Sequence, residues 1–472
     1  MSLMPTIAYH TLGCKVNQYE TEKIREALER AGSETVPFAA KADAYIINTC
    51  TVTGVADSKS RAAVRRALKL NPDAFIVVSG CYAELEPTRI ALIEGVDLVV
   101  TNSDKDSIAE RVISRFGGSG FQIREEGSGI ANPGPSVLGG PSALSGPSGL
   151  PFTQHSTLNT QHLVRPRTRT RAIVKVQDGC DQFCSYCVVP FARSRKMSRP
   201  MDDVTAELRA LAEFGYKEIV LTGIRLGSYQ HNGARLPELI RAASSVSGIE
   251  RIRLSSVEAW EIDDALLDAI DSPKVCRHLH VPLQSGDDEV LRRMNRPYTT
   301  GQLEQMIERA RKRIPGIGIT TDVIVGFPGE SEEAFENTCG MVERVGFSRL
   351  HVFRYSPRKR ASAAEMPGQI DSKTKKQRSE TLIELGRLSM RRFAESFVGR
   401  TLTVLVEKAL PLTPTLSRQG RGSIDKILTG YADNYVEVVF TGPPSLVGKI
   451  VPVTVLSVDE AGTAECGIGD VE

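Results

Sequence analysis

The sequence alternates short apolar runs with longer helical patterns in two separate blocks, and this alternation constrains its fold more than any other feature. In residues 5 to 115 the apolar runs are TIAYHTLG, AYIINT, AFIVVSG and VDLVVT, with helical stretches such as ETEKIREALERAG and SKSRAAVRRALKL between them. Such a succession predicts a parallel sheet whose strands are joined by right-handed crossovers. We therefore predict an α/β fold, with a Rossmann-like parallel sheet in residues 1–117.

The second block, residues 169–395, predicts a partial or full TIM-like barrel. Its strand patterns are TRAIVKVQDGC, EIVLTG, RIRLSS, HLHVPL, GITTDVIVGF and SRLHVFRYSP, and helical patterns separate most of them. Chemistry in parallel barrels lies at the C-terminal ends of the strands. A loop with three cysteines directly follows the first of these strands.

Two segments interrupt the regular patterns. Residues 118–168 are rich in Gly, Ser and Pro, which predicts a flexible linker or insertion. After residue 396, the runs TLTVLVE, YVEVVF and KIVPVTVLSVDE predict a small β-barrel that ends at residue 472. The stretch ALPLTPTLSRQGRGS, residues 409 to 423, breaks that pattern and is expected to be a loop insertion.

Composition limits the cellular setting. The 472 residues are 41% hydrophobic and 25% charged, and no apolar run approaches the roughly 18 residues of a membrane span. The start of the chain has no export signal, so we expect a cytoplasmic protein without membrane contacts. Nine cysteines, an odd number, suit a reducing compartment, where clustered thiols are metal ligands or catalysts rather than disulfides.

Cys180, Cys184 and Cys187 form a CxxxCxxC pattern on the loop after the first barrel strand. Three thiolates on so short a loop can bind one metal centre, but an iron cluster or a structural zinc takes four ligands. The next cysteine along the chain, Cys276, is 89 residues away. An iron–sulfur cluster with one open iron is the main interpretation, and a zinc site completed by a distant residue or a chance grouping are the alternatives.

Three further cysteines occupy equivalent positions. Cys14, Cys50 and Cys81 each lie just past the end of a predicted strand, 36 and 31 residues apart. Parallel strands bring their C-terminal ends to one edge of the sheet, where ligands bind. We predict a second three-cysteine cluster site; three buried structural cysteines are the alternative. Cys276, Cys339 and Cys466 share no spacing and are expected to be structural.

The cysteine loop resembles the radical S-adenosylmethionine (SAM) superfamily, because the aromatic Tyr186 precedes the third cysteine and a barrel strand precedes the loop. In that superfamily SAM chelates the open iron. A longer set of motifs resembles the methylthiotransferases, radical enzymes that act on tRNA or on a ribosomal protein. These motifs are TLGCKVNQYETE, NTCTVT, SGCYAE, LTGIRLGSY, RIRLSSVE, HVPLQSGDDEVLRRMNRPYT and DVIVGFPGE. GCKVNQYETE is most similar to the branch that modifies N6-threonylcarbamoyladenosine beside the tRNA anticodon.

The resemblance implies two [4Fe-4S] clusters with different tasks. Cys180, Cys184 and Cys187 are expected to hold the cluster that cleaves SAM to a deoxyadenosyl radical. Cys14, Cys50 and Cys81 are expected to hold an auxiliary cluster, with SAM also serving as methyl donor. The closing β segment resembles the TRAM domain, an RNA-binding barrel. The implied partners are the tRNA anticodon stem-loop and an electron donor such as flavodoxin or ferredoxin, and the sulfur donor is left open.

Further residues near predicted strand ends are candidates for binding SAM. Gly223 and Gly227 would let the backbone approach the methionine amino group, although a plain turn also explains them. Ser255, Glu258 and Gln284 could hydrogen-bond the ribose or amino group, and loop or cap roles are the alternative. Apolar Ile324 beside Gly326 suits an adenine edge, although GFPGE could instead begin a helix.

Two basic segments suit an RNA partner. The run VRPRTRTR contains Arg165, Arg167, Arg169 and Arg171, and residues 354 to 400 carry twelve Lys or Arg against five Asp or Glu. Such charges give affinity for phosphates, or form only a solvated face. We expect the substrate to bind between the β-barrel and the two clusters, and the two insertions to affect tRNA docking rather than catalysis.

Two other functions remain possible on the sequence. One is methylthiotransfer to isopentenyladenosine in tRNA or to an aspartate of a ribosomal protein. The other is a nonenzymatic electron carrier or RNA-binding iron–sulfur protein. The open iron and the barrel favour an enzyme, because an electron carrier needs neither.

Overall fold

The computed structural model describes residues 4–117, 169–411 and 425–468. The predicted linker, residues 118–168, and most of the predicted insertion at 409 to 423 lie outside the described residues. The first two residues of that insertion were placed wrongly, because Ala409 and Leu410 pair with Leu428 and Ile427 inside a β-strand. No helix in the described part of the chain is long and apolar enough to cross a membrane.

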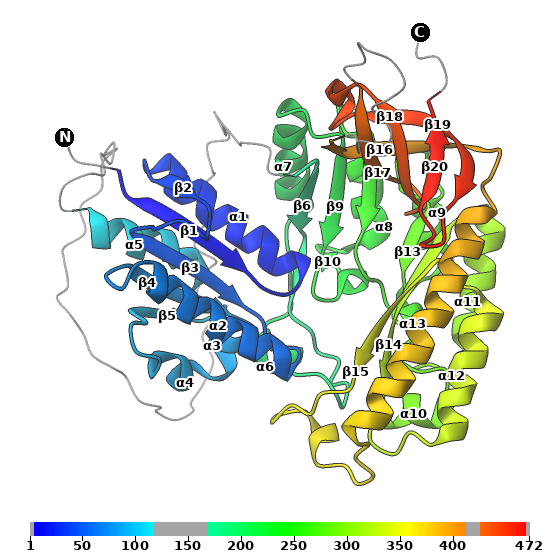
Figure 1. Ribbon diagram of the computed structural model, residues 1–472, viewed down its shortest axis with the longest axis horizontal. Helices are drawn as coiled ribbons and strands as arrows, with labels where there is room; N and C mark the ends of the chain where they lie inside the picture. The colour runs from blue at the N-terminus through cyan, green and yellow to red at the C-terminus, as the bar shows by residue number, and fades with distance from the viewer. Residues whose placement is uncertain (1–3, 118–168, 412–424, 469–472) are drawn as a thin grey trace.

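The N-terminal part is a five-stranded parallel sheet between helices (Figure 1). Helix α1 packs with α5 on one face, where Leu28 and Val112 meet Ile46, and α2 covers the other face. Both faces of the sheet are therefore apolar, as expected for parallel strands. In sheet order the strands are β2 (Glu34–Val36), β1 (Thr6–Thr11), β3 (Ala44–Thr49), β4 (Phe75–Gly80) and β5 (Leu98–Val100). The helices are α1 (Lys15–Arg30), α2 (Gly54–Leu70), α3 (Cys81–Leu85), α4 (Pro87–Ala91) and α5 (Ile108–Phe116).

The central part is an open barrel of six parallel strands. Two three-stranded sheets meet where Ile252 bridges Val275 and Ser256 bridges His280, and the strands at the two free edges are β6 and β15. The predicted α/β fold is confirmed, and the barrel is partial rather than full. In order the strands are β6 (Arg171–Lys175), β9 (Glu218–Thr222), β12 (Arg251–Leu254), β13 (His278–His280), β14 (Gly318–Val325) and β15 (Arg349–Arg354).

Helices cover the outside of this barrel (Figure 1). Alternate strand residues such as Ile219, Ile252 and Val323 join one large apolar core with these helices. The opposite residues of the same strands, many of them charged or polar, face the interior of the barrel. The helices are α6 (Val189–Ala192), α7 (Met201–Glu213), α8 (Leu236–Ser244), α9 (Asp264–Ile270), α10 (Asp288–Arg293), α11 (Thr300–Arg313), α12 (Glu332–Val345) and α13 (Ser372–Glu395). Two short antiparallel strand pairs lie in the loops: β7 (Gln177–Asp178) with β8 (Met197–Ser198), and β10 (Gln230–His231) with β11 (Ala234–Arg235).

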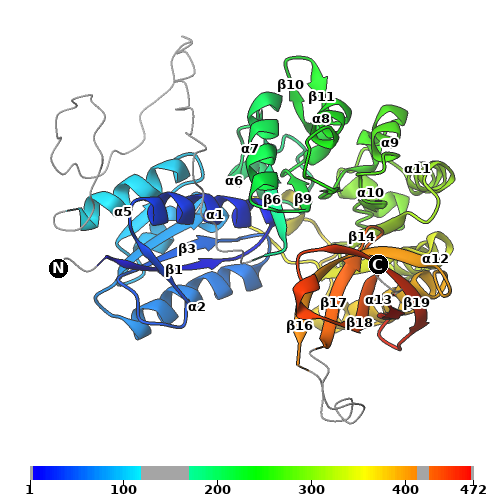
Figure 2. The same cartoon turned by 90° about the horizontal axis from the view of Figure 1, so that it is seen from above.

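The C-terminal part is a closed five-stranded β-barrel, as predicted. Strand β16 closes it by pairing with both β17 and β19. Figure 2 shows this barrel and the N-terminal sheet as separate bodies that both contact the central barrel. In barrel order the strands are β16 (Thr401–Leu410), β17 (Lys426–Ala432), β18 (Glu437–Gly442), β20 (Ala464–Gly467) and β19 (Ile450–Val458).

The turn between β17 and β18 docks on the N-terminal end of the central barrel. Tyr435 in this turn stacks on His278 at 4.6 Å between ring centroids. The guanidinium of Arg253 lies 4.7 Å from the Tyr435 ring and donates to the carbonyls of Ala432 and Asp433, each at 3.1 Å. The C-terminal β-barrel is therefore fixed at the end of the central barrel opposite the cysteine loop.

Candidate iron–sulfur and cofactor site

Cys14, Cys50 and Cys81 lie at one edge of the N-terminal sheet. Strands β1, β3 and β4 are adjacent and parallel, and one of these cysteines closely follows each strand. Burial raises the pKa of the Cys50 thiol to about 11, and the negative charges of Cys81 and Cys14 contribute to the increase. The strand order thus brings together three thiols that the sequence separates by 36 and 31 residues.

Glycines make this close approach possible. Gly13 has a φ of +93°, and a Cβ atom at this position would lie 2.8 Å from Cβ and 2.9 Å from Sγ of Cys50. Gly80, directly before Cys81, has a φ of +100°, and a Cβ there would clash with the backbone of Thr49. Left-handed backbone of this kind favours glycine. Packing at this edge of the sheet, which we call the cysteine edge, therefore restricts the residues before Cys14 and Cys81 to glycine.

Cys180, Cys184 and Cys187 lie on the loop between β7 and α6, at the C-terminal end of the central barrel. Burial raises the pKa of Cys187 to about 12, and the charges of Cys184 and Cys180 raise it further. Backbone amides point at two of the sulfurs: the N–H of Gln182 lies 3.4 Å from the Sγ of Cys180, and that of Val189 lies 3.4 Å from the Sγ of Cys187. Amides in this orientation stabilise thiolates, the form that binds iron.

Both cysteine triads suit a cluster better than a single ion. All nine cysteines of the chain are free thiols. Among the described residues, the ligand atoms of one group only, His280, Asp322 and His351, all lie within 4.8 Å of one another. The thiols of each triad are thus spaced more widely than the ligands of a tetrahedral zinc, whose Zn–S bonds are about 2.3 Å. Three free thiols per site at this wider spacing fit an iron–sulfur cluster.

The two triads are neighbours. Cys81 packs in one apolar cluster with Val188 and Ala192, which follow Cys187 on the cysteine loop of the central barrel. The amide of Asn102 donates to the carbonyl of Ala192 at 2.8 Å and lies 3.9 Å from the Sγ of Cys81. The N-terminal sheet and the central barrel therefore present their cysteines to the same region.

A buried charge network holds the two parts together. Glu20 of α1 accepts hydrogen bonds from Arg193 at 2.8 and 2.9 Å, from Lys175 at 2.9 Å, and from Lys105. Arg193 also donates to Asn17 at 2.9 Å, while its own carbonyl accepts from the N–H of Cys180 at 3.2 Å. Arg193 thus links the cysteine loop of the central barrel to the helix that begins after Cys14.

A second contact joins the same two parts on the other side of the cysteine edge. Arg358 donates to Asp57 at 2.7 Å and also to Thr51, directly after Cys50. The hydroxyl of Ser356 accepts from the N–H of Gly54 at 3.1 Å. Sequence reasoning missed these linking residues, because buried ion pairs between distant segments leave no local pattern.

Several residues predicted to bind SAM lie at the same end of the central barrel as the cysteine loop. Tyr186 and Ile324 pack in one apolar cluster with Phe327 and Tyr355. Ser255 is buried, and its hydroxyl has no hydrogen-bond partner among the described residues. Gln284 is also buried and adopts a φ of +64°, which is strained for a residue with a side chain. An orphaned hydroxyl and local strain are features of binding sites.

Other predicted cofactor contacts have partners within the protein. The carboxylate of Glu258 pairs with Arg296, whose guanidinium also lies 3.6 Å from the Sγ of Cys184. The missing side chain of Gly223 leaves room for Gln177, whose Oε1 would lie 2.8 Å from a Cβ, and Gly227 leaves room for Glu261. The N–H of Gly326 donates to Glu330 at 2.6 Å. Packing within the protein thus accounts for both Gly223 and Gly227, and Arg296 is a residue that sequence reasoning missed.

Several arginines of the two basic segments are paired with acidic side chains within the protein. Arg171 is paired with Glu218 at 3.2 Å and with Glu407. Arg378 is paired with Glu330 at 2.7 Å and Arg358 with Asp57. These arginines join parts of the fold and are not available for phosphate. Arg169 contacts Gln18 of α1, and Arg165 and Arg167 lie outside the described residues.

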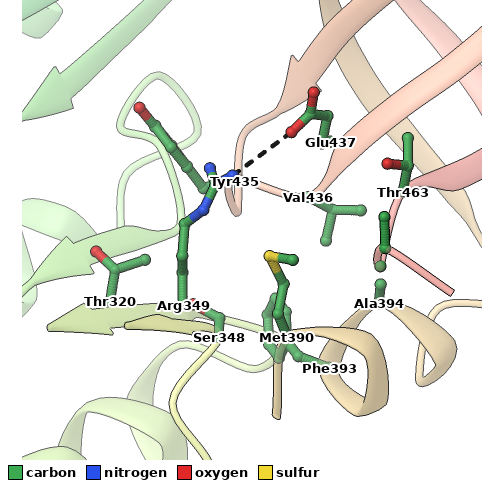
Figure 3. A pocket seen from close by; sticks show the side chains of 12 residues that line it. Thr320, Ser348, Arg349, Met390, Phe393, Ala394, Tyr435, Val436, Glu437 and Thr463 are labelled. Carbon is green, nitrogen blue, oxygen red and sulfur yellow. Dashed lines mark ion pairs between the residues drawn. The ribbon is translucent and has the colours of Figure 1, made fainter. Parts of the chain in front are cut away.

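A cleft of about 360 Å³ follows the seam between the central barrel and the C-terminal β-barrel. Figure 3 shows Arg349 of β15 facing Glu437 of β18 across this seam, with the closest charged atoms 3.6 Å apart. Met390 and Phe393 of α13 form its apolar wall. The cleft lies at the end of the barrel away from the thiols, so it is not the site that the cysteines form.

Two known protein families match the two parts of the chain that carry the thiols. Residues 174–342 match the radical SAM superfamily, and residues 6–101 match the uncharacterized protein family UPF0004. The threonylcarbamoyladenosine tRNA methylthiotransferase MtaB of Bacillus subtilis is 40% identical over 96% of this chain and 94% of its own length. The protein of the same name from Thermotoga maritima is 34% identical over 99% and 98%.

More distant relatives share the architecture. A tRNA-2-methylthio-N(6)-dimethylallyladenosine synthase of Syntrophomonas wolfei is 33% identical over 94% of each chain. The radical SAM methyltransferase TsrM of Kitasatospora setae, solved with cobalamin and a [4Fe-4S] cluster, superposes with a TM-score of 0.51 over 75% of each chain at 18% identity. The structural likeness shows the fold alone. A radical SAM domain implies SAM and an iron–sulfur cluster as its cofactors.

Proposed function

Since this chain belongs to the family of radical SAM tRNA methylthiotransferases, we propose that it adds a methylthio group to C2 of N6-threonylcarbamoyladenosine next to the tRNA anticodon. The observation that carries the proposal is the pair of neighbouring thiol triads. Each lies at the C-terminal ends of parallel strands, and Cys81 packs against the loop that bears the other triad. Relatives named for this substrate match nearly the whole chain.

We assign one [4Fe-4S] cluster to each triad. Cys180, Cys184 and Cys187 would hold the cluster that binds SAM, and Cys14, Cys50 and Cys81 would hold the auxiliary cluster. When bound, the clusters and SAM supply a deoxyadenosyl radical, a sulfur atom and a methyl group. A small electron-transfer protein such as flavodoxin or ferredoxin would deliver the reducing electrons.

The chain itself positions and shields these groups. Arg296 lies 3.6 Å from the Sγ of Cys184 and is oriented by Glu258, so it places a positive charge beside the thiols that would bind the SAM cluster. The free hydroxyl of Ser255 and the strained Gln284 lie at the ends of neighbouring strands, where they can hydrogen-bond SAM. Tyr186 and Ile324 provide the apolar surface for its adenine. The Glu20 and Arg193 network keeps the two triads at a fixed separation.

Exposed apolar side chains surround the thiols. Phe183 is 56% exposed beside Cys184, and it meets Phe191 edge-on at 5.6 Å. Val52, two residues after Cys50, is 55% exposed. A soluble surface rarely clusters such residues without a ligand, and RNA bases that leave their stack bind on aromatic side chains. These residues would receive the anticodon loop.

Nucleoside mass spectrometry tests the proposal in cells that lack their own enzyme. Expression of the chain should add the mass of one methylthio group to threonylcarbamoyladenosine. The Cys14→Ala and Cys184→Ala variants should abolish this product, whereas Cys276→Ala, at a buried cysteine outside both triads, should retain it. Modification of isopentenyladenosine instead would move the substrate to the neighbouring branch. No tRNA product, despite assembled clusters, would refute a tRNA substrate.

A further inference from the structure

A group of polar side chains inside the central barrel has no role in the function proposed above. His280, Asp322 and His351 lie on the neighbouring strands β13, β14 and β15 and face the barrel interior. The Nε2 of His280 lies 3.2 Å from a carboxylate oxygen of Asp322, and its Nδ1 lies 2.8 Å from the hydroxyl of Thr320. Both nitrogens of His280 are thus engaged, and Asp322 is directed at His280.

His351 remains available for a ligand. Its ring lies 5.7 Å from that of His280, centroid to centroid. It is exposed, and neither of its ring nitrogens has a hydrogen-bond partner among the described residues. Because β15 is an edge strand of the open barrel, His351 faces the opening rather than the packed core.

Lys15 lies on α1, which packs against β6, the edge strand across the opening of the barrel from β15. It is the first residue of α1 and directly follows Cys14, and Asn17 and Glu20 of the same helix bind Arg193 of the central part. Partial desolvation of its ring lowers the pKa of His351, and among the charges that affect it are Asp322, which raises it, and Lys15, which lowers it further. Within the described residues, Lys15 is exposed and makes no hydrogen bond or ion pair.

The balance of charge around His351 favours an anion over a metal ion. The fixed cations are Lys15 and Arg349, and both act on His351. Of the two acids, Asp322 is engaged by His280, and Glu437 is 3.6 Å from Arg349. A divalent cation would be repelled by Lys15 and would have to displace an existing partner of Asp322. An anion would instead pair with Lys15, which has no partner in the described part of the chain.

We propose that Lys15 and His351 bind the carboxylate of the threonylcarbamoyl group and thereby select this adenosine. The inference rests on the proposed function. In adenine, C2 and the carbon that carries N6 flank the same ring nitrogen, so the N6 substituent extends from the edge that reacts. A base that places C2 beside the auxiliary thiols therefore carries its carboxylate past Cys14 to the next residue, Lys15.

The pair also explains how other adenosines are rejected. An isopentenyl group has no carboxylate, so it would leave Lys15 unpaired and would meet polar rather than apolar side chains. A site built to bind a charged group discriminates strongly against an analogue that lacks it. The contact is remote from the reacting atom and is made equally before and during reaction, so its loss should raise KM more than it lowers kcat.

The test compares two RNAs with each enzyme, reconstituted with iron and sulfide under anaerobic conditions. One is an anticodon stem-loop with threonylcarbamoyladenosine, and the other is the same RNA with its carboxylate converted to the neutral carboxamide. The wild-type enzyme should prefer the carboxylate RNA. In Lys15→Gln, kcat/KM for the carboxylate RNA should fall on the order of 10- to 100-fold, as expected for one charge-assisted hydrogen bond. The carboxamide RNA should change little.

Two further variants sharpen the result. Lys15→Arg keeps the charge and should preserve most of the preference, whereas His351→Phe keeps a ring of similar size and should lower it. Lys69→Gln, an exposed lysine in the last turn of α2, is the matched control. Because the preference is a ratio within one enzyme preparation, incomplete cluster assembly in a variant does not alter it.

The outcomes separate this inference from the proposed function. A wild-type enzyme that modifies both RNAs equally, or a Lys15→Gln variant that keeps the preference, would overturn the inference and leave the proposed function intact. A wild-type enzyme that modifies neither RNA, with both clusters assembled and SAM cleaved, would refute the proposed function itself.

Discussion

Replacement of Glu20 by Gln should separate the two halves of the site. The carboxylate of Glu20 is buried in α1 and accepts hydrogen bonds from three cations, of which Lys175 and Arg193 belong to the central part and Lys105 to the N-terminal part. Gln keeps the volume of the side chain but removes its charge. In the variant, Asp178 would be the remaining acid beside Lys175 and Arg193, at 3.0 and 2.9 Å.

The expected loss follows from this geometry. Removing one partner of a buried ion pair destabilises a protein by roughly 3–5 kcal/mol, because the remaining charge is left without compensation. Asp178 and the amide oxygen of Gln compensate in part, so we expect about 3 kcal/mol. Since the network joins two parts of the chain, most of this loss should appear as weaker docking between them.

The same network predicts how stability depends on pH. Burial would raise the pKa of Glu20, but the charges of Lys105, Arg193 and Lys175 together hold it well below its ordinary value of 4.5. A carboxyl whose pKa is lowered by folding stabilises the folded state above its unfolded pKa, and this contribution is lost as the pH falls through the folded pKa. The wild type and Glu20→Gln should therefore differ fully at pH 6 to 8, and the difference should begin to shrink only below about pH 4.5 and vanish below the folded pKa.

Urea unfolding of the reconstituted protein measures the effect, with the fluorescence of Trp260, the single tryptophan, as the signal. Glu22→Gln is the matched control on the same helix, because Glu22 is 36% exposed and pairs only with Arg25 among the described residues. The control should change stability by less than about 0.5 kcal/mol. A loss below about 1 kcal/mol in Glu20→Gln, or an equal loss in the control, would refute the reasoning.

Three further variants test other parts of the structure. Gly80→Ala should destabilise the N-terminal sheet by at least about 2 kcal/mol, because it combines a positive φ with a clash against Thr49. Hydrogen exchange of the backbone amides in β3 and β4 should become faster, and unchanged exchange rates would count against the clash. Tyr435→Ala removes the stack on His278 and should weaken docking of the C-terminal β-barrel by about 2 kcal/mol. Limited proteolysis between the two barrels should become faster, and an unchanged cleavage rate would contradict the docking role. Cys276→Ala should retain the full iron content of the wild type, and a proportional loss of iron would show that this buried cysteine is a ligand.

The fold followed from patterns that are local in sequence. Apolar runs such as AYIINT and AFIVVSG became buried strands because both faces of a parallel sheet are covered by helices. The convergence of Cys14, Cys50 and Cys81 could be predicted as well, since strand ends at one sheet edge are a property of the topology rather than of side-chain packing. That these three thiols bind an iron–sulfur cluster stays a prediction.

The connecting residues could not be read from the sequence. Glu20 and Arg193 are 173 positions apart and each has the appearance of an ordinary surface charge on a helix or loop. Burial and pairing, which decide what a charge does, arise only when the two parts dock. The same reason explains why the pairing of Arg171 and Arg378 could not be predicted, since their acidic partners lie in segments distant along the chain.

The position of the C-terminal β-barrel changes where an RNA must lie. The turn around Tyr435 closes the N-terminal end of the central barrel, whereas both thiol triads lie at the C-terminal ends of strands. Strand β14, with eight residues, separates these ends by about 26 Å at 3.3 Å per residue. An RNA that contacts both must therefore extend along the central barrel, which lies between the C-terminal β-barrel and the thiol triads. The C-terminal β-barrel can then contribute affinity through phosphates far from the reacting base, while the choice of base is left to side chains near the thiols, among them Lys15.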